Sequence, residues 1–452
     1  MNRRQFLAFV GGSAAGLSAT GCATAAGKRA KRPNVVVIVA DDLGYGELSV
    51  QGSTDILTPN IDSIARNGVR FTDGYVTCPV CSPTRAGLLT GRYQQRFGHE
   101  FNPGGMGTES KRFGLPLSET TLAQRLKDLG YATGMFGKWH LGTRDGYYPT
   151  DRGFDEFFGF LGGAHSYVNA MAEAKNPILR GKTVVDELDY TTDTFAREAC
   201  EFIDRHREHP FFVYVPFNAV HSPMDTIEKY VAPFAGMRDE KRRKFAGMLT
   251  ALDAGVGSIL GKLNETGLTD DTLVIFISDN GGPTPQITSK NDPLRGYKGQ
   301  MLEGGIRVPF MMQWPGRIPA GLTYSEPVIS LDIVPTVMAA AREELDASSG
   351  CEGVDLVPYV KGKRADAPHE ALFWRQGKNF AVRKGDFKLV QQAGAPLALY
   401  NLADDIHEDR DLAALLPDKV RELQADWDAW NADNIEPLWE RGETPRRRAA
   451  TG

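Results

Sequence analysis

The cysteine at position 81 starts the segment with the clearest chemical potential, because it begins the run CSPTR and leads directly into a short helical pattern. Cys78 stands three residues earlier, so the two cysteines form a CxxC pair. Such a pair serves elsewhere as a redox couple or as half of a zinc site. The five cysteines of the chain are Cys22, Cys78, Cys81, Cys200 and Cys351. No second CxxC follows and no disulfide framework is indicated, so a redox pair is the alternative to a chemistry of Cys81 alone.

Four oxygen-bearing side chains follow two apolar runs that have the composition of buried parallel strands. The side chains are Asp41, Asp42, Asp279 and Asn280, and the runs are Asn34–Ala40 and Thr272–Ile277. Ligands of open α/β sheets gather beyond the carboxyl ends of the strands, so these oxygens predict a site for a hard cation. Calcium is the favoured ion and magnesium the alternative. The competing interpretation is that each acidic side chain caps a neighbouring helix.

Four basic residues stand in short motifs beside further strand-like runs. Lys138 and His140 belong to GKWH, which follows the apolar run Tyr131–Phe136. His221 belongs to FNAVHSP, which follows another apolar run, and Lys298 belongs to LRGYKG, which precedes EGGIRVP. Taken singly, each motif is weak, since a lone histidine is more often structural and a lone lysine is usually solvated. Their order along the chain, together with that of the cysteine and the carboxylates, makes them informative.

In this order the segments resemble the type I sulfatases, the formylglycine-dependent members of the alkaline phosphatase superfamily. Their motifs resemble in particular those of exported bacterial carbohydrate sulfatases. CSPTR resembles the maturation signature in which a formylglycine-generating enzyme converts the first cysteine, here Cys81, to formylglycine. One hydroxyl of the hydrated aldehyde would attack sulfur. The other, once deprotonated, would collapse the sulfated intermediate, whereas a thiolate offers only the first of these steps.

The resemblance implies a role for each motif residue. The implied metal ligands are Asp41, Asp42, Asp279, Asn280 and an oxygen of the modified Cys81. The implied catalytic residues are Cys81, Arg85, Lys138, His140, His221 and Lys298. The two lysines would bind sulfate oxygens, and the arginine would hold the formylglycine diol in position. His221 would protonate the departing alcohol, and His140 would take the proton from the remaining hydroxyl.

The amino terminus resembles an export signal, which spans residues 1–32 together with a linker. Arg3 and Arg4 resemble a twin-arginine motif, and the apolar stretch that follows is too short to predict a membrane span. Ala19 to Cys22 resembles a bacterial lipobox with Cys22 as the lipidated residue. A general secretion signal and simple cleavage without lipidation are the alternatives. These features predict an exported bacterial protein of the periplasm or cell envelope, in contact with the membrane only through a lipid anchor.

Composition restricts the class of protein. The chain has 452 residues, of which 41% are hydrophobic and 10% aromatic, as in an ordinary globular enzyme. A formal net charge of −5 argues against a nucleic-acid partner. Strands and helical patterns alternate in residues 33–345, which predicts an α/β catalytic domain. We expect an alkaline phosphatase-like fold, with a large, mostly parallel sheet between two layers of helices.

The pattern changes in residues 346–440. Three short strands joined by glycine turns predict a small antiparallel sheet, followed by a helix at Pro417–Asn431. This part resembles the small carboxy-terminal subdomain of sulfatases. Residues 441–452 form an arginine- and alanine-rich tail. Among the helices predicted in the larger domain, the longest covers Lys241–Leu263, where apolar residues keep helical spacing.

The sequence points to sulfate monoester hydrolysis on a sulfated polysaccharide, either a galactan such as carrageenan or a glycosaminoglycan. The loops around the site supply the substrate-binding candidates, which are Arg96, His99, Glu100, His165 and Arg375. An arylsulfatase and a phosphate or phosphonate ester hydrolase of the same superfamily are alternatives. A non-catalytic binder of sulfated glycans with an unconverted Cys81 is another. The oligomeric state is left open.

Overall fold

The centre of the fold is β1 (Asn34–Ala40), whose seven residues are all buried. The structure is a computed structural model of the chain and describes residues 32–104 and 113–440. β1 pairs in parallel with β8 (Phe211–Pro216) on one side and with β9 (Thr272–Ser278) on the other. Both neighbours are also buried throughout, as their unbroken apolar sequences predict. The carboxyl ends of these three strands therefore meet at one edge of the sheet.

Further strands widen this sheet on both sides. β4 (Ala132–Lys138) pairs in parallel with β8, and β5 (Glu156–Phe160) pairs in parallel with β4. The remaining strands are β2 (Val69–Phe71), β6 (Leu179–Arg180), β7 (Thr183–Val184), β10 (Phe310–Gln313) and β11 (Leu322–Tyr324). Within the described residues the strand order is β11-β2-β10-β9-β1-β8-β4-β5-β6-β7, and the pairings of β10, β6 and β7 are antiparallel. The sheet is therefore large and mostly parallel, as predicted.

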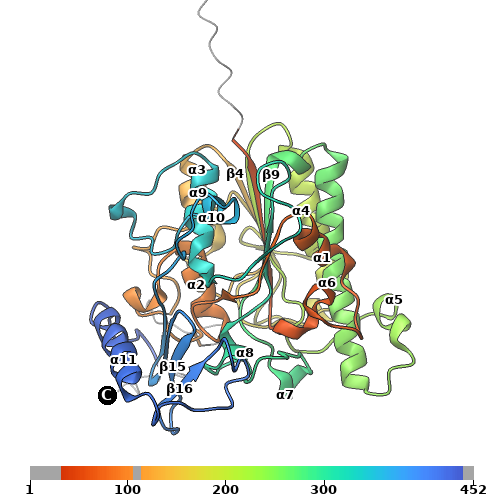
Figure 1. The fold of residues 1–452 in the computed structure, drawn as a ribbon. Coiled ribbons are helices and arrows are strands. Elements are labelled where there is room, and N and C mark those ends of the chain that lie inside the picture. Colours follow the sequence, from red (N-terminus) through yellow and green to blue (C-terminus); the bar gives the residue numbers. More distant parts are fainter. Residues whose placement is uncertain (1–31, 105–112, 441–452) are drawn as a thin grey trace, which may run out of the picture. The chain divides into compact units, whose positions relative to one another are not determined.

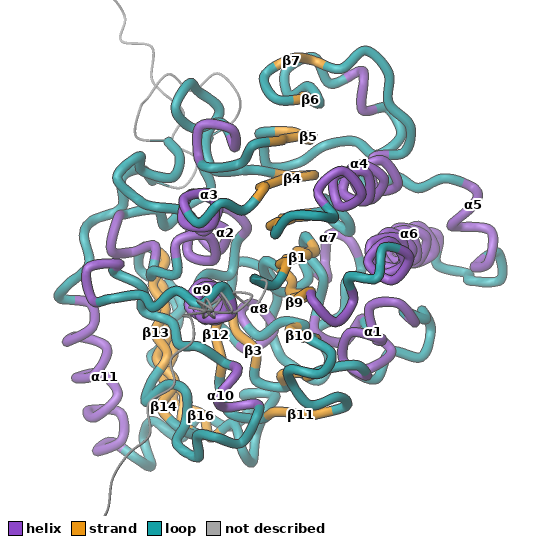
Figure 2. Tube along the Cα trace, turned by 90° about the horizontal axis from the view of Figure 1, so that it is seen from above, coloured by secondary structure: helices purple, strands orange, loops and turns teal. Residues whose placement is uncertain are grey.

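Helices cover both faces of the large sheet (Figures 1 and 2). One face carries α1 (Pro59–Arg66), α4 (Thr191–His206) and α6 (Glu240–Glu265), and the other carries α2 (Cys81–Thr90), α3 (Leu122–Asp128) and α9 (Ile333–Ala340). Alternate residues of β1 enter two separate cores, one on each face. The long predicted helix is α6, which extends a residue or two beyond both predicted ends.

A second sheet lies near the carboxyl end of the chain. It is antiparallel and consists of β13 (Leu372–Gln376), β14 (Asn379–Lys384), β15 (Phe387–Gln391) and β16 (Ala398–Asn401). α11 (Pro417–Asn431) packs on one face through Leu423, which contacts a small cluster of buried residues from three of the strands. This arrangement confirms the predicted small antiparallel sheet and adds β16, which had not been predicted as a strand.

An apolar contact and buried ion pairs connect the second sheet to the first. Trp374 and Trp430 share a core with Tyr75, and the indole N–H of Trp374 donates to the Val76 carbonyl at 2.7 Å. Six charged residues, here called the buried ion-pair network, connect the two parts: Asp73, Glu303, Arg307, Arg383, Lys388 and Glu408. Chain contacts keep both sheets in one unit from Arg32 onward, and the predicted division at residues 345/346 stays a prediction.

Several short elements complete the described chain. They are β3 (Gly74–Tyr75), β12 (Val328–Ile329), α5 (Glu228–Val231), α7 (Thr284–Ile287), α8 (Glu303–Ile306) and α10 (Val357–Val360). Among the described residues, no helix has the length and apolar character needed to cross a membrane. The predicted export signal, with Arg3, Arg4 and Cys22, lies outside the described residues, as does the tail 441–452.

Candidate active site

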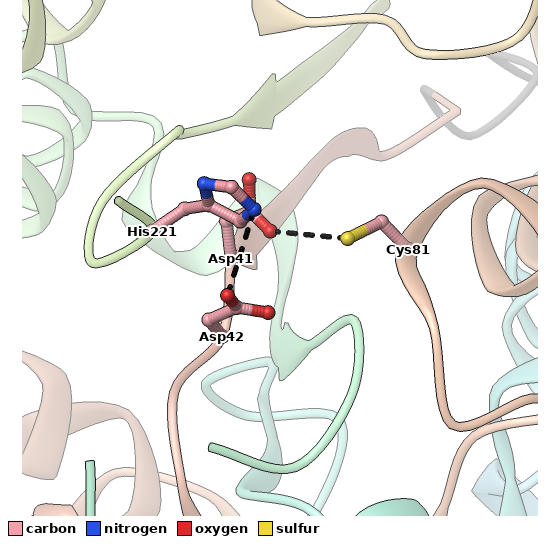
Figure 3. A group of neighbouring side chains, drawn as sticks. All are labelled: Asp41, Asp42, Cys81 and His221. Carbon is pink, nitrogen blue, oxygen red and sulfur yellow. Dashed lines mark hydrogen bonds and ion pairs between the residues drawn. The ribbon is translucent and has the colours of Figure 1, made fainter. Parts of the chain in front are cut away.

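Three separate segments bring Asp41, Asp42, Cys81 and His221 together (Figure 3). The two aspartates follow β1, Cys81 is the first residue of α2, and His221 follows β8. Cys81 Sγ lies 3.5 Å from Asp41 Oδ1, and His221 Nε2 lies 3.6 Å from Asp42 Oδ2. One ligand atom from each of the four residues lies within 4.8 Å of the others. Residues that are far apart in the sequence thus form one cluster at the sheet edge.

Asp279 and Asn280, the two residues that directly follow β9, also belong to the site. The backbone N–H of Asp42 donates to Asp279 Oδ1 at 3.2 Å, and Asn280 Nδ2 donates to Asp42 Oδ1 at 2.7 Å. The other amide atom, Asn280 Oδ1, is buried without a hydrogen-bond partner. A buried acceptor without a partner carries a free-energy cost unless something else satisfies it. Three carboxylates and this oxygen are the donors that a hard divalent cation prefers, so the residues present fit such an ion.

Close backbone packing holds the β9 end against the segment that follows Lys298. Gly281 N–H donates to the Gly305 carbonyl at 3.1 Å, and a Cβ at Gly281 would lie 1.8 Å from Gly304 O. Only glycine allows so close an approach at this position. The GG of the motif SDNGG therefore lets the metal-ligand candidates and the Lys298 loop lie side by side.

Two lysines face the carboxylates, of which Lys138 is fully buried and Lys298 partly buried. Lys138 Nζ lies 2.6 Å from Asp41 Oδ2, and Lys298 Nζ lies 2.6 Å from Asp42 Oδ1. Lys298 Nζ is also 3.3 Å from Cys81 Sγ. The neighbouring carboxylates raise the pKa of Lys298 well above its usual value despite its burial. Lys298 is therefore cationic, next to the residue at which the reaction would take place.

Arg85 lies one helical turn after Cys81 and is fully buried. Its guanidinium donates twice to Asp279 Oδ2, at 2.7 and 3.0 Å, and once to the Lys138 carbonyl at 3.0 Å. These bonds connect α2 to β9 and β4. In the structure Arg85 thus holds a metal-ligand candidate and the backbone of a lysine in place, while its predicted contact with a formylglycine diol stays a prediction.

The state of the two cysteine thiols bears on the redox alternative. Cys78 and Cys81 are both free and buried. Burial, with the charge of Asp279 next, raises the pKa of Cys81 to about 12. Burial also raises the pKa of Cys78 well above its usual value. Both thiols are therefore protonated at neutral pH, and a CxxC redox pair needs a thiolate.

The two predicted catalytic histidines have different surroundings. His221 Nδ1 lies 2.5 Å from the Ser222 carbonyl, which can only accept, so Nδ1 carries a hydrogen and Nε2 faces Asp42. His140 has a positive φ of 60°, and its Nδ1 is buried without a partner. Burial first, and then the charges of nearby cations, lower the pKa of His140 well below its usual value. A neutral imidazole can accept a proton, as the predicted base must.

Three of the predicted substrate-binding residues have ionic partners within the protein. Arg96 bonds to Glu352 at 2.8 Å and to the Trp430 carbonyl at 2.9 Å. Glu100 accepts from the Arg375 guanidinium, with one bond of 3.0 Å. These ion pairs connect the loop after α2 with the carboxy-terminal part of the chain. Their roles in the structure are therefore contacts between segments, and their binding of substrate stays a prediction.

The two histidines among these candidates are buried. His99 Nε2 lies 2.7 Å from Ser82 Oγ, and the His99 ring packs edge-on against Trp439. His165 Nδ1 lies 2.9 Å from the Ser166 carbonyl, and its ring packs against Phe160. Neither histidine lines the pocket described below.

Sequence reasoning missed Ser82 and Asn102, which organise the start of α2. Ser82 Oγ donates to the His140 carbonyl at 2.6 Å, and Ser82 N–H donates to Asn102 Oδ1 at 3.0 Å. Ser82 therefore connects the residue after Cys81 to a second catalytic candidate and to the loop beyond α2. The only sequence signal for Ser82 was its place inside the CSPTR run, and this did not indicate which residues Ser82 would contact.

A pocket of about 360 Å³ opens onto this cluster. Its lining includes Asp42, His221 and Lys298, which we call the floor. We call five further lining residues the rim: Val80, Phe101, Asn102, Gln286 and Gln376. The rim includes two residues of the loop that follows α2 and also Gln376, the last residue of β13, so both parts of the chain contribute to the pocket. A volume of this size suits a small molecule or one or two sugar units.

Fold and site together are typical of a hydrolase of anionic esters built on a mostly parallel α/β sheet, in which carboxylates that fit a hard cation lie next to lysines and histidines. The chain belongs to the sulfatase family: the family model described as Sulfatase matches residues 33–343. A second model, described as N-sulphoglucosamine sulphohydrolase, C-terminal, matches residues 297–425. The protein is thus a sulfuric ester hydrolase, and the family generally uses a metal ion and formylglycine.

Named relatives agree with this assignment. Arylsulfatase A of Homo sapiens is 36% identical over 79% of this chain and 75% of its own length. N-acetylgalactosamine-6-sulfatase of Sus scrofa is 31% identical over 83% of this chain and 73% of its own length. The crystal structure of Ps i-CgsB is similar with a TM-score of 0.86 and 34% identity, covering 91% of this chain and 95% of that one. The resemblance in fold thus includes both sheets.

Proposed function

We propose that this sulfatase removes sulfate from a sulfated oligosaccharide or polysaccharide, such as a carrageenan-type galactan or a glycosaminoglycan. The observation that carries the proposal is the pocket, whose lining combines three amide side chains and an aromatic ring with Asp42, His221 and Lys298. A crystal structure of Ps i-CgsB in complex with k-i-k-neocarrahexaose supports a carbohydrate substrate. Aryl sulfates are expected to serve as artificial substrates, because a phenolate leaves easily.

The metal site is proposed to hold Ca²⁺, with Mg²⁺ as the alternative. Asp41, Asp42, Asp279 and Asn280 would hold the ion, which would withdraw negative charge from the sulfate. Cys81 is proposed to be converted to formylglycine by a formylglycine-generating enzyme, and its hydrated aldehyde supplies the attacking hydroxyl. The protonated thiol of the unconverted residue supports this proposal, since a thiol with a pKa of about 12 is a poor nucleophile.

The side chains around Cys81 are proposed to bind the sulfate and to move protons. Lys138 and Lys298 offer ammonium groups to sulfate oxygens, where negative charge increases as the S–O bond breaks. His221 delivers a proton from Nε2 to the departing alcohol, because Nδ1 is engaged by the Ser222 carbonyl. His140 accepts the last proton at the end of the cycle. Burial lowers the pKa of His221 below its usual value, and the charges of Asp41 and Asp42 oppose this shift.

Export to the periplasm or cell envelope is proposed on residues 1–32, with Arg3 and Arg4 as the export motif and Cys22 as the lipid-bearing residue. Mass spectrometry of the mature amino terminus from fractionated cells tests this. A diacylated Cys22 would support anchoring. An unprocessed terminus starting at Met1 or Asn2 would contradict export.

The test of the main proposal combines two measurements on one preparation. Mass spectrometry of the peptide that contains residue 81 reports the fraction of formylglycine. Release of sulfate and of phosphate from esters of the same alcohol then reports the reaction. Faster sulfate release in proportion to the formylglycine content supports the proposal. Faster phosphate release would favour the phosphate ester hydrolase, and glycan binding with an unconverted thiol would favour the non-catalytic binder.

A further inference from the structure

The rim of the pocket carries more information about the substrate than its floor does. The floor holds the charged groups that any sulfate ester would meet. The rim holds an aromatic ring, Phe101, and carboxamides, of which Gln376 comes from the second sheet. Both of these side chains are partly exposed. They are therefore accessible to whatever carries the sulfate.

We propose that Phe101 and Gln376 form a saccharide subsite for a neutral hexose, which stacks one face on the Phe101 ring while its hydroxyls pair with the Gln376 carboxamide. This inference rests on the proposed function and specifies the sugar. An aromatic face carries partial negative charge and attracts the weakly positive C–H groups on one side of a hexose. A carboxamide both donates and accepts hydrogen bonds, as hydroxyl groups do.

Phe101 is held at a set position relative to Cys81. The indole N–H of Trp439 lies 3.1 Å from the Phe101 carbonyl and 3.2 Å from the Asn102 carbonyl. Asn102 Oδ1 accepts from the N–H of Ser82, which directly follows Cys81. The backbone on both sides of the ring is thus anchored to the start of α2 and to the end of the described chain. A preorganised ring loses little conformational freedom when a ligand binds.

Gln376 is held in a similar way by an ion pair beneath it. Arg375 donates to Glu100, and Glu100 Oε2 accepts from the Gly377 N–H at 2.9 Å. Gly377 has a φ of +59°, and a Cβ there would lie 3.0 Å from Phe101 Cζ. Glycine thus lets the β13–β14 turn approach the Phe101 ring, so that the ring and the amide belong to one surface. In this arrangement Glu100 and Arg375 act as positioning residues.

The charge of the rim selects the kind of sugar. The five rim residues carry no formal charge. Lys298, the one lysine among the described residues that line the pocket, is paired with Asp42 at 2.6 Å. A uronate or a second sulfate would need an additional cation, for which arginine is the usual choice. The described residues that line the pocket supply none, so a hexose whose only charge is the reacting sulfate fits best.

Binding to a Cys81→Ala background tests the subsite without turnover. The probes are a sulfated neutral galacto-oligosaccharide, a sulfated uronate-containing disaccharide and inorganic sulfate, measured by calorimetry. Phe101→Ala should weaken binding of the galacto-oligosaccharide by about tenfold, the upper range for one aromatic contact. Phe101→Tyr, which keeps the ring, should bind within about twofold of the background protein. Inorganic sulfate, which reaches only the floor, should bind equally well to all three proteins.

Gln376→Ala provides the second arm, with Gln391→Ala on the same sheet as its matched control, because Gln391 does not line the pocket. Gln376→Ala should weaken galacto-oligosaccharide binding several-fold, about the value of one hydrogen bond, while Gln391→Ala should leave it unchanged. Unaltered affinity in both Phe101→Ala and Gln376→Ala would overturn the subsite. Tighter binding of the uronate probe than of the neutral one would overturn the choice of sugar.

Hydrolysis assays on the wild-type protein distinguish a failure of the proposed subsite from a failure of the proposed function. Turnover of aryl sulfates but of no hexose sulfate would contradict the subsite and leave the sulfatase assignment in place. Loss of binding in the variants, combined with wild-type protein that contains formylglycine and hydrolyses no sulfate ester, would support the subsite and contradict the proposed reaction.

Discussion

Two buried clusters in this protein contain the same charges and have different properties. The active-site cluster comprises Asp41, Asp42, Asp279, Arg85, Lys138 and Lys298. The buried ion-pair network comprises Asp73, Glu303, Glu408, Arg307, Arg383 and Lys388. Each set holds three carboxylates and three cations, so charge alone does not distinguish the active-site cluster from the network.

The difference lies in what remains for a ligand. In the network, Glu303 uses both carboxylate oxygens, accepting from Lys388 at 2.8 Å and from the Tyr75 hydroxyl at 2.6 Å. The charges of Lys388, Arg307 and Arg383 lower the pKa of Glu303 to about 2 despite its burial. In the active-site cluster, Asn280 Oδ1 has no partner and the Asp42 end opens into the pocket. Access to the pocket, rather than charge pairing, distinguishes the active-site cluster from the network.

The largest effect is expected from Cys81→Ala, which should abolish sulfate release and leave the fold intact. The side chain holds neither cluster together, since its contacts with Asp41 and Lys298 are 3.5 and 3.3 Å long. Sulfate release and the melting temperature are the measurements. Cys78→Ser is the matched control and should retain most of the activity. An equally inactive but folded Cys78→Ser protein would restore the redox-pair interpretation.

His221→Ala should lower the rate by about 10² to 10⁴ on a sugar sulfate and much less on a nitrophenyl sulfate. The reason is that a sugar alkoxide needs a proton in order to leave, whereas a nitrophenolate is already stabilised. The ratio of kcat/KM for the two esters measures this. His140→Ala is the comparison variant and should slow both esters alike. Equal losses on both esters for His221→Ala would reject the division of labour between the histidines.

Lys388→Met tests the closed network. Removing this fully buried lysine leaves Glu303 and Glu408 facing each other, which should lower the free energy of unfolding by about 3–5 kcal/mol. Chemical denaturation measures the change, and kcat of the folded fraction should be retained. Lys384→Met on β14 is the control, because Lys384 pairs with surface acids and should cost about 1 kcal/mol or less. Similar losses in the two variants would mean that the network does not depend on its buried lysine.

Chelation tests the open cluster and should lower the stability less than the loss of Lys388 does. An ion at 100 times its Kd contributes about 2.7 kcal/mol by mass action, and this would be lost together with activity. Lys138 and Lys298 still offset part of the carboxylate charge once the ion is gone. Melting temperature and sulfate release, before and after addition of Ca²⁺, are the measurements. A protein that is free of metal by elemental analysis and fully active would contradict the cation site.

The parts of the molecule that follow local patterns could be predicted from the sequence. α11 has the predicted bounds, and the apolar runs became β1 and β9 because burial on both faces requires unbroken apolar residues. Convergence of Asp41 and Asp279 followed from the geometry of parallel strands, which brings their carboxyl ends to one edge. These inferences needed no knowledge of distant contacts.

The candidate substrate residues could not be placed in this way. Glu100 pairs with Arg375, 275 residues further along the chain, and Arg96 pairs with Glu352 over 256 residues. A charged residue in a loop looks the same whether its partner is a ligand or another loop, and periodicity carries no information on that choice. The loop assignment was nevertheless useful, because Phe101, which lines the pocket, directly follows the candidate Glu100.

The bonds from Trp439 to the Phe101–Asn102 loop have a consequence for the timing of synthesis. Trp439 follows Phe101 by 338 residues, so this anchor cannot form until nearly the whole chain has left the ribosome. At about 5–20 residues per second, that delay is roughly 20–70 seconds. Cys81 is only 1% exposed once the fold is complete. An enzyme that must reach Cys81 therefore has an interval set by the rate of translation, and slower elongation should raise the fraction of converted protein.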